Sequence, residues 1–311
     1  MNSLSVTTDL SPIALFTYAR PEHTRRTVEA LKANHGAADS ELFIFSDGAK
    51  NAAAADSVQA VRGYLRTITG FKRIEIIERE RNFGLADSIV DGVSTLTGRY
   101  GRVIVLEDDI VTAPTFLSFM NQALTLYTHD QAVMHISGYF FPVTDTEATV
   151  LPETFFYNQT SCWGWGTWDR AWQHYRDDAA GLLRDIKRYG RLREFDMENW
   201  FRFSSTLRAN AAGRQRTWAI KWHASVFLKH GLCLHPRYSL THNIGHDGSG
   251  THGQPDERYH DPHFPPTNPV TIERGELIES RAARLLARTF LAQLQPPLWH
   301  RVLTHLRRLL S

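Results

Sequence analysis

The first 140 residues of the chain alternate between short apolar segments and segments with helical periodicity. In one of the latter, Ile89, Val93 and Leu96 recur at helical spacing, and we expect Leu85 on the same face. Strands that alternate with helices build a mostly parallel sheet with helices on both faces. The pattern therefore predicts a doubly wound α/β fold. We expect its strands at residues 13–18, 41–45, 73–77, 102–106 and 132–137.

After residue 140 this alternation ends. We expect a strand at residues 155–158, a loop rich in glycine and tryptophan at residues 162–172 that runs into a helix, and a long helix at residues 194–211. Helices resume at about residues 276–294 and 298–310.

The composition excludes several classes of protein. The net charge is only +2, which argues against nucleic acid as a partner. The first residues lack the basic start and apolar core of a secretory signal, and no apolar run reaches the ~20 residues that span a bilayer. Cys162 and Cys233 have no metal-binding spacing, and we expect both to be unpaired. These features predict a cytoplasmic protein.

Three consecutive acids, Glu107, Asp108 and Asp109, follow an apolar run at residues 103–106. In a parallel sheet they would lie at the carboxyl end of a buried strand, where ligands of α/β folds bind. Adjacent carboxylates repel one another unless a cation neutralises them, and their oxygens suit Mg²⁺ or Mn²⁺, which often also bind phosphate. The sequence therefore predicts a metal site here, with a solvated acidic loop as the alternative.

Polar residues also follow the other expected strands. Arg20 can bind phosphate through its guanidinium group, and Asp47 can accept hydrogen bonds from a base or a ribose. Asn82 and Gly84 form a loop where the backbone can approach a ligand closely. The alternative is that Asp47 lies in a simple turn and Asn82 at the start of a helix. Because all four residues follow strands of one sheet, their convergence on one edge favours a binding site.

Two common phosphate-binding motifs are absent from the sequence. No G-x-G-x-x-G follows the first expected strand, and no G-x-x-x-x-G-K-[ST] occurs. Phosphate would then be held by a metal ion and arginine.

The order of these pieces resembles nucleotide-sugar-dependent glycosyltransferases of the GT-A fold. The pieces are YARP at residues 18–21, SDG at 46–48, NFGL at 82–85 and VLEDD at 105–109. The acidic motif, with APTF at residues 113–116 after it, is similar to the eukaryotic N-acetylglucosaminyltransferase I group. Later pieces resemble bacterial sugar transferases from surface-polysaccharide clusters, namely WGWGTW at residues 163–168 and NIGHDGSGTH at residues 243–252. The resemblance covers about residues 12–255.

The resemblance implies transfer of a sugar from a nucleoside-diphosphate sugar, with a UDP-sugar favoured, to a glycan or lipid-linked acceptor. It implies an inverting, metal-dependent reaction in bacterial surface polysaccharide synthesis. Asp109 would ligate Mn²⁺ or Mg²⁺, Asp108 would contact ribose or sugar, and Glu107 would orient its neighbours. The other donor contacts would be Tyr18, Arg20, Asp47, Asn82, Gly84 and Leu85.

The same resemblance divides the chain into three regions. Residues 1–235 would form the GT-A catalytic domain, with a donor half at about residues 12–140 and an acceptor half at about 141–235. Residues 236–270 would form an active-site loop region, and residues 271–311 a C-terminal helical tail.

An inverting displacement needs a general base for the acceptor hydroxyl. In relatives we expect an acid within a Trp-Asp-x-x-Trp element, but here Ala219 occupies that position, in WAIKW at residues 218–222. The remaining candidates are Asp247, Asp169 and Glu198. We favour Asp247, because its glycine-rich loop could fold over the donor, whereas Asp169 could simply cap a helix.

Two aromatic residues and one histidine complete the candidate site. Trp163 and Trp165 lie beside glycines and could form a sugar platform, since indole faces suit the C–H surface of a sugar, whereas for Trp168 we favour core packing. His252 is our candidate for a metal or phosphate contact, because a neutral imidazole can complete a metal shell. The other histidines of that loop are expected to be structural or exposed.

The C-terminal segment from Leu298 to Leu310 combines an apolar face with basic residues and no acid. Such a helix can lie on an anionic membrane, which would place the protein peripherally at the inner membrane, or it can dock on the protein itself. Two other functions also remain open. A sugar nucleotidyltransferase would share the sheet and the metal, and an inactive glycan-binding relative would be compatible with Ala219.

Overall fold

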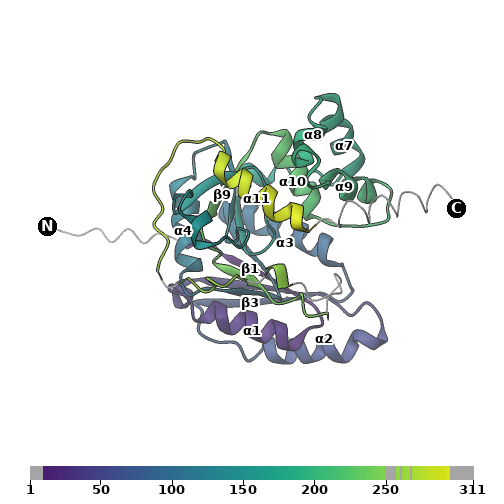
Figure 1. Ribbon diagram of the computed structural model, residues 1–311. Coiled ribbons are helices and arrows are strands. Elements are labelled where there is room, and N and C mark those ends of the chain that lie inside the picture. The colour runs from purple at the N-terminus through teal and green to yellow at the C-terminus, as the bar shows by residue number, and fades with distance from the viewer. Residues whose placement is uncertain (1–9, 249–256, 260, 267, 295–311) are drawn as a thin grey trace.

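A computed structural model describes residues 10–248, 257–259, 261–266 and 268–294 (Figure 1). It has a central eight-stranded sheet flanked by helices, which confirms the predicted mostly parallel α/β fold. Of the eight strands, β8 and β7 run opposite to the others. In their order across the sheet, the strands are β3 (Arg73–Glu78), β2 (Glu41–Ser46), β1 (Ile13–Thr17), β4 (Arg102–Glu107), β8 (Trp165–Trp168), β6 (Val133–Ser137), β9 (Leu232–Pro236) and β7 (Thr154–Tyr157).

Both faces of the sheet are buried, because successive side chains of a strand point to opposite sides. In β1, Ile13 and Leu15 contribute to one core cluster, whereas Ala14 and Phe16 contribute to the other. The first face is covered by α1 (Pro21–Lys32), α2 (Ala52–Leu65) and α4 (Phe116–Leu126). The second face is covered by α3 (Leu85–Tyr100), α6 (Asp169–Trp172) and α10 (Ala219–Leu228).

Helix α3 shows how closely the periodicity predicted burial. Ile89, Val93 and Leu96 are buried in the second core cluster, as expected. Leu85 is not, since it is the first residue of the helix and 52% of its surface is exposed. The predicted inward orientation of Leu85 is therefore wrong.

The segment expected to be a loop at residues 162–172 contains a central strand, β8, between β4 and β6. Glycine weakens a strand intrinsically, which is why the sequence pattern predicted a loop. At Gly166, however, a Cβ would lie 2.9 Å from the Met120 side chain and 3.1 Å from the Val103 carbonyl oxygen. Glycine is needed there because α4 packs directly on this strand.

A helical lobe, defined here as residues 179–229, lies at the upper right of Figure 1. It contains α7 (Ala179–Arg188), α8 (Leu192–Phe195), the 3₁₀ turn η2 (Met197–Asn199), α9 (Phe203–Ala211) and α10. The single helix expected at residues 194–211 is interrupted, because the three residues of η2 all have positive φ angles, from 48° to 70°. Left-handed residues cannot continue a right-handed helix. Asp196 then starts α9 by accepting hydrogen bonds from the Ser204 backbone and hydroxyl at 2.7 and 2.6 Å.

The C-terminal third adds short elements around the sheet. Thr241–Asn243 (β10) pairs with Ile110–Thr112 (β5) as a two-stranded antiparallel ribbon. The last described helix is α11, which starts at residue 281 instead of 276. The remaining elements are η1 (Ala37–Asp39), α5 (Asp145–Ala148), η3 (Glu257–Tyr259) and α11 (Arg281–Gln293).

Both cysteines are free, as predicted. Of the helices in the described ranges, none combines the length and apolar character needed to cross a bilayer. The expected helix from Leu298 to Leu310 lies outside the described residues.

Two buried histidines predict how stability depends on pH. Burial lowers the pKa of His223 and of His235 to about 4, compared with about 6.5 in an unfolded chain. As the pH falls from 6.5 toward 4, the unfolded chain takes up protons that the folded chain does not, so the free energy of unfolding decreases. We expect a loss of roughly 2–3 kcal/mol per histidine between neutral pH and about pH 4.5, measured by urea denaturation.

His223→Phe is the informative variant, because the imidazole already stacks on Phe195 with ring centroids 5.2 Å apart. The variant should retain the aromatic packing and lose the part of the pH dependence that His223 supplies. A stability profile parallel to that of the unaltered chain would contradict the assignment.

Candidate functional site

The three acids predicted from the sequence lie at the carboxyl end of β4, beside the end of the neighbouring strand β1. Arg20, in the turn between β1 and α1, binds two of them. Its Nη2 atom is 2.6 Å from Asp108 Oδ1 and 2.7 Å from Asp109 Oδ2. Burial lowers the pKa of Arg20, but the charges of Asp108 and Asp109 raise it more, so the net shift is upward. One guanidinium group thus faces three carboxyl groups, in what we call the acid corner (Glu107, Asp108 and Asp109).

Further contacts fix Asp108 more firmly than Asp109. The Tyr18 backbone donates a hydrogen bond to Asp108 Oδ2 at 3.2 Å, and the Thr27 hydroxyl donates to the Asp108 carbonyl oxygen at 2.9 Å. By contrast, Asp109 Oδ1 is buried and accepts no hydrogen bond. A buried carboxylate oxygen without a partner is costly, so this atom is a ready ligand for a cation.

The electrostatics of Glu107 show that the corner is short of positive charge. Burial, followed by the charges of Asp109 and Asp108, raises the pKa of Glu107 to about 8, although a hydrogen bond from the Trp218 side chain opposes this. Burial and the charges of Glu107 and Asp109 also raise the pKa of the Cys162 thiol. A bound cation would relieve this repulsion.

Asp47, at the end of β2, organises the loop that precedes α3. Its Oδ1 atom accepts hydrogen bonds from the backbone of Gly48 and Phe83 at 2.9 and 2.8 Å. Its Oδ2 atom accepts from the Asn82 side chain and the Gly84 backbone, both at 2.9 Å. The loop therefore depends on the carboxylate, and Asn82, Gly84 and Leu85 are held next to the end of β2.

Glycine is required at two positions around this loop. A Cβ at Gly48 would lie 2.5 Å from the Arg81 carbonyl carbon, so the two backbones touch. Gly84 has a φ of 76°, which other residues rarely adopt. The backbones at Gly48 and Arg81 thus lie closer together, next to the start of α3, than a side chain at position 48 would allow.

The loop after β10 lies directly over the acid corner. The Ile244 backbone donates to the Asp109 carbonyl oxygen at 2.9 Å, and the Gly245 backbone donates to Asn243 Oδ1 at 2.7 Å. A Cβ at Gly245 would collide with Asp109 Oδ2. Asp247 Oδ2 is 3.0 Å from His23 Nε2 of α1, so this loop also reaches across to the helix that follows Arg20.

Aromatic rings form a wall beside the same loop. Trp163 is half-buried, with its ring centroid 4.5 Å from that of Tyr139 and 5.1 Å from that of Tyr259. His246 stacks on Tyr259 at 4.9 Å. Trp163 therefore lies where a ligand of the acid corner could contact it.

Trp165 lies on the other side of the sheet, and the prediction of a ligand contact is wrong for this residue. It is completely buried and stacks on Trp218 at 5.0 Å and on His135 at 5.3 Å. A fully buried indole has no face to offer a sugar. Trp168 is also in the core, as expected.

Two of the three candidate bases are far from the acid corner. The antiparallel register of β8 pairs Trp168 with Arg102, so Asp169 follows at the amino end of β4, about 17 Å from the corner for a six-residue strand. Glu198 belongs to η2 and binds Arg284 of α11 at 2.5 Å, so its carboxylate secures the lobe. Of the three, Asp247 alone lies near the acids. His252, the predicted metal or phosphate contact, lies outside the described residues.

Several residues of the site were not identified from the sequence. They are His23, Asn243, Gly245 and Trp218. The motif at residues 243–252 contained two of them, but only the pairing of β10 with β5 shows that it covers Asp109. Nothing in the local sequence connects Trp218 with Glu107.

A groove of about 430 Å³ lies at the far end of the same sheet edge, beyond the ends of β9 and β7. Tyr238, His263 and a run of prolines line it, together with Glu153 and Arg237. It is three strand spacings from β4, about 14 Å along the sheet, so it is separate from the acid corner.

The sequence of residues 13–175 matches the family model "Glycosyl transferase family 2". This match covers more than half of the 311 residues, and the sheet has the GT-A arrangement of a nucleotide-sugar transferase. The protein is thus a glycosyltransferase of the GT-A fold, as predicted. The chain belongs to glycosyl transferase family 2, whereas the finer likeness to the N-acetylglucosaminyltransferase I group stays a prediction.

Solved structures show only weak likeness. The mannosyltransferase PcManGT from Pyrobaculum calidifontis, in complex with GDP-Man and Mn²⁺, is 11% identical, with a TM-score of 0.37 over 71% of this chain and 72% of that chain. Mouse xyloside xylosyltransferase 1 is 10% identical, with a TM-score of 0.39 over 71% and 82%. S. aureus TarS is 12% identical, with a TM-score of 0.30 over 41% of this chain and 21% of that chain, so this chain spans about a fifth of TarS. No curated protein matches the sequence.

Asp47→Ala should unfold the loop before α3. The substitution leaves three backbone N–H groups, one buried and two partly buried, without their acceptor, and each costs about 1–3 kcal/mol, partly recovered by water. We expect the free energy of unfolding to decrease by about 3 kcal/mol in urea titrations. The matched control is Asp56→Ala on α2, whose side chain is exposed and makes no ion pair with any described residue, and which should change stability by less than about 0.5 kcal/mol. Equal effects of the two substitutions would contradict the role of Asp47.

Proposed function

We propose that this glycosyltransferase moves a sugar from a nucleoside-diphosphate sugar, with a UDP-sugar favoured, to a glycan or lipid-linked acceptor in bacterial surface polysaccharide synthesis. The reaction is metal-dependent and inverting. The observation that carries the proposal is the acid corner, where one arginine faces three carboxylates and Asp109 keeps a buried oxygen without a hydrogen bond.

The residues of the corner fit Mn²⁺ or Mg²⁺. Mg²⁺ is commonly held by one or two carboxylates, while substrate phosphates and water supply its other ligands, and Mn²⁺ prefers the same oxygen donors. In the described part of the chain no three His, Cys, Asp or Glu side chains are grouped for a metal, so Asp109 would be the main protein ligand. When bound, the ion would stabilise the charge that develops on the departing nucleoside diphosphate.

The protein groups around Asp109 are suited to the rest of the donor. Arg20 already spans Asp108 and Asp109, so its guanidinium group can turn toward a phosphate oxygen when a cation takes over part of this charge. The start of α3 supplies the positive end of a 16-residue helix, which favours an anionic diphosphate. Tyr18 and the loop ordered by Asp47 complete the nucleotide side.

Asp247 is the proposed general base. Its loop contacts Asp109 through Gly245, and the Asp247 side chain is 47% exposed. His23 holds the carboxylate from the opposite side, at 3.0 Å. An acceptor hydroxyl that approaches the donor beneath this loop could pass its proton to Asp247.

The alternatives are affected differently by the family assignment. A sugar nucleotidyltransferase is replaced by the glycosyltransferase assignment, because the family model matches more than half of the chain. An inactive glycan-binding relative would show no turnover, whereas the proposed transferase would. The proposed membrane contact of the segment from Leu298 to Leu310 stays a prediction.

A thermal-shift screen with UDP, GDP, dTDP and CMP, each with and without Mn²⁺, tests the metal site. We expect one nucleotide with Mn²⁺ to raise the melting temperature by roughly 5 °C, since ligand at 100 times its Kd stabilises a protein by about 2.7 kcal/mol. Asp109→Ala should abolish the metal-dependent part, whereas the control Asp56→Ala on α2 should retain it. A metal-dependent shift that survives in Asp109→Ala would remove this residue from the site.

Asp247→Asn should lower kcat by about 10²–10⁴ with a sugar donor of the nucleotide found in that screen, because a general base contributes rate enhancement of this order. The donor Kd should stay within about twofold. Asp169→Asn is the matched control, because Asp169 was another candidate for the general base and lies at the opposite edge of the sheet. Normal turnover in Asp247→Asn would reject it as the base, and a large loss in Asp169→Asn would contradict the geometry.

A further inference from the structure

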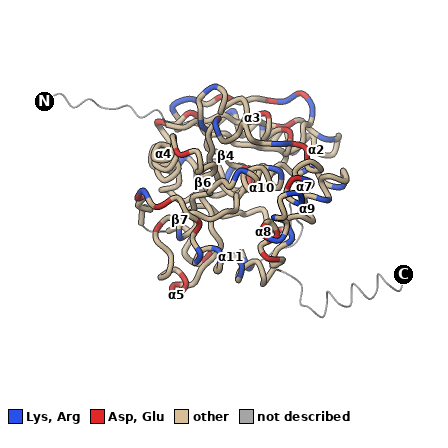
Figure 2. Tube along the Cα trace, turned by 90° about the horizontal axis from the view of Figure 1, so that it is seen from above, with Lys and Arg blue, Asp and Glu red and all other residues tan. Residues whose placement is uncertain are grey.

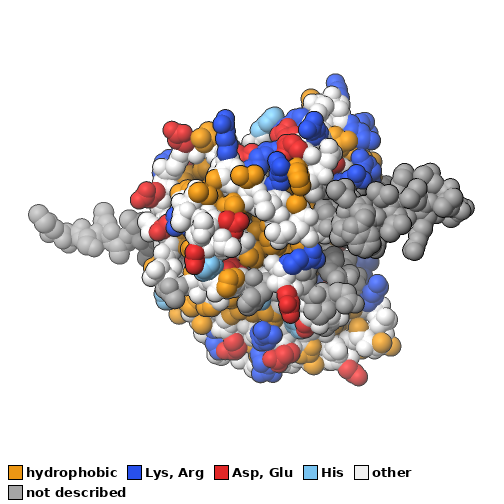
Figure 3. Space-filling view, viewed as in Figure 1, with side chains coloured by type: hydrophobic (Ala, Val, Ile, Leu, Met, Phe, Trp, Pro, Cys, Tyr) orange, Lys and Arg blue, Asp and Glu red, His pale blue; other side chains and the backbone are white. Residues whose placement is uncertain are grey.

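The charge of the chain is distributed very unevenly. Residues 179–229, the helical lobe, contain 11 Lys and Arg and 4 Asp and Glu, a net charge of +7. The remaining sequence, with 24 basic and 29 acidic residues, has a net charge of −5. Figure 2 shows Lys and Arg along α7, α8 and α9, and Figure 3 shows them gathered at the upper right, where these helices lie in Figure 1. Although the net charge is only +2, the charge of the molecule is therefore distributed very asymmetrically.

The four acids of the lobe do not neutralise its surface. Each is at least partly buried and has a partner: Asp185 binds Arg176, Glu194 binds Arg191, Asp196 binds Ser204 and Glu198 binds Arg284. The exposed basic residues of the lobe are mostly unpaired, since eight of them make no ion pair with any described residue. These eight are Arg184, Lys187, Arg188, Arg193, Arg202, Arg208, Arg214 and Lys229. The solvent-facing charge of the lobe is thus almost entirely positive.

Exposed hydrophobic side chains accompany these charges. Tyr189, at the end of α7, is 65% exposed, and Trp200, directly after η2, is 40% exposed. Leu285 of α11 is 57% exposed. Helix α11 is joined to the lobe, since Arg288 lies over the Trp200 ring at 4.2 Å. Aromatic and aliphatic side chains among basic residues are typical of surfaces that lie in the headgroup region of a membrane.

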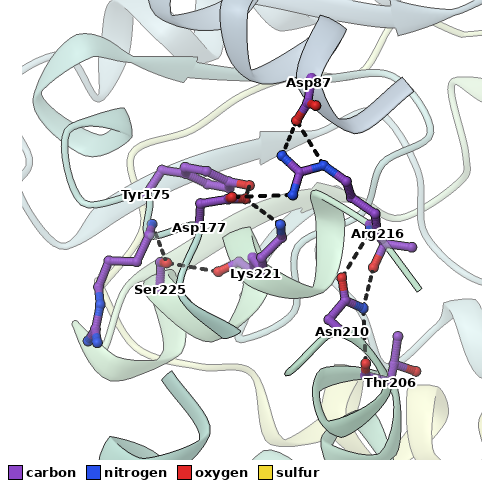
Figure 4. Close-up of polar contacts among 10 residues, drawn as sticks. Asp87, Tyr175, Asp177, Thr206, Asn210, Arg216, Lys221 and Ser225 are labelled. Carbon is purple, nitrogen blue, oxygen red and sulfur yellow. Dashed lines mark hydrogen bonds and ion pairs between the residues drawn. The ribbon is translucent and has the colours of Figure 1, made fainter. Parts of the chain in front are cut away.

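The lobe is tied firmly to the helix that starts at the nucleotide side of the site (Figure 4). Arg216 donates a hydrogen bond from Nε to Asp87, in the first turn of α3, at 3.0 Å. The same guanidinium group lies 3.5 Å from Asp177, which also binds Lys221 of α10 and accepts a hydrogen bond from the Tyr175 hydroxyl at 3.2 Å. The lobe therefore contacts α3 at its first turn.

We propose that the helical lobe binds the anionic headgroups of a lipid bilayer and orients the molecule on it. The charge of +7 is attracted to the surface while the remaining −5 is repelled, so the field selects one orientation. Tyr189, Trp200 and Leu285 add apolar contacts at the interface. Lipid is favoured over nucleic acid because an exposed aliphatic side chain accompanies the aromatic ones. This surface is distinct from the C-terminal segment at residues 298–310.

Co-sedimentation of the full chain with vesicles tests the proposal without any donor or acceptor. We expect binding to phosphatidylcholine vesicles that contain phosphatidylglycerol, loss of binding at high salt, and no binding to phosphatidylcholine alone. Arg184→Gln, Lys187→Gln and Arg188→Gln, combined on α7, should weaken partitioning about 100-fold, since each basic residue near the surface contributes roughly fivefold. The control triple Arg26→Gln, Arg66→Gln and Lys72→Gln removes the same charge from exposed positions outside the lobe and should change little.

A chain shortened after Leu294 separates the lobe from the C-terminal segment. It should still bind anionic vesicles, and brominated lipids should quench its tryptophan fluorescence, because Trp200 is exposed there. Trp200→Phe in the shortened chain should remove most of that quenching. Any one of three results would overturn the proposal: the two triple variants have equal effects, the shortened chain loses all binding, or a DNA duplex binds equally tightly and displaces the vesicles. Since none of these measurements needs turnover, their outcome is independent of whether the proposed transfer reaction is correct.

Discussion

The site depends on the contact between Arg20 and the two aspartates at the end of β4. Three adjacent carboxylates repel one another, and in a partly buried position this repulsion would push the strand end apart or protonate it. Arg20 prevents this by bridging Asp108 and Asp109 at 2.6 and 2.7 Å. It binds only two of the three acids, and the pKa of Glu107 stays raised, first by burial and then by the charges of Asp109 and Asp108. The corner is therefore stable enough to fold and negative enough to attract a cation.

The architecture places every other part of the site relative to this contact. Adjacent parallel strands end at the same edge, so Arg20 after β1, Asp47 after β2 and the acids after β4 come together. The ribbon of β5 and β10 then brings the loop with Gly245 and Asp247 over Asp109. On the other side, Arg216 connects the start of α3 to the lobe. The proposed donor site, the proposed base and the proposed membrane surface are thus connected through direct contacts.

Much of the donor side could be predicted from the sequence, because its signals are local. An apolar run followed by acids indicates a strand end, and the helical spacing in α3 indicates its buried face. The acceptor side could not be predicted in the same way. Asp169 was a candidate base from the sequence, but the antiparallel direction of β8 places it at the opposite edge. Trp165 looked like a sugar platform, but whether an indole faces ligand or core depends on what packs on it.

The sequence by itself determined the order of strands and helices, the family and the acid corner, because each of these depends on residues that are close together in the chain. The tertiary structure alone decided the rest, since strand direction, burial and pairing depend on residues far apart. It placed the loop with Asp247 over the acids and Asp169 at the opposite edge of the sheet, revealed the close approach of Gly245 to Asp109, and showed that the acids of the lobe are paired while most of its basic residues face solvent. Charge composition can be counted in a sequence, but which charges remain unneutralised is decided only by folding.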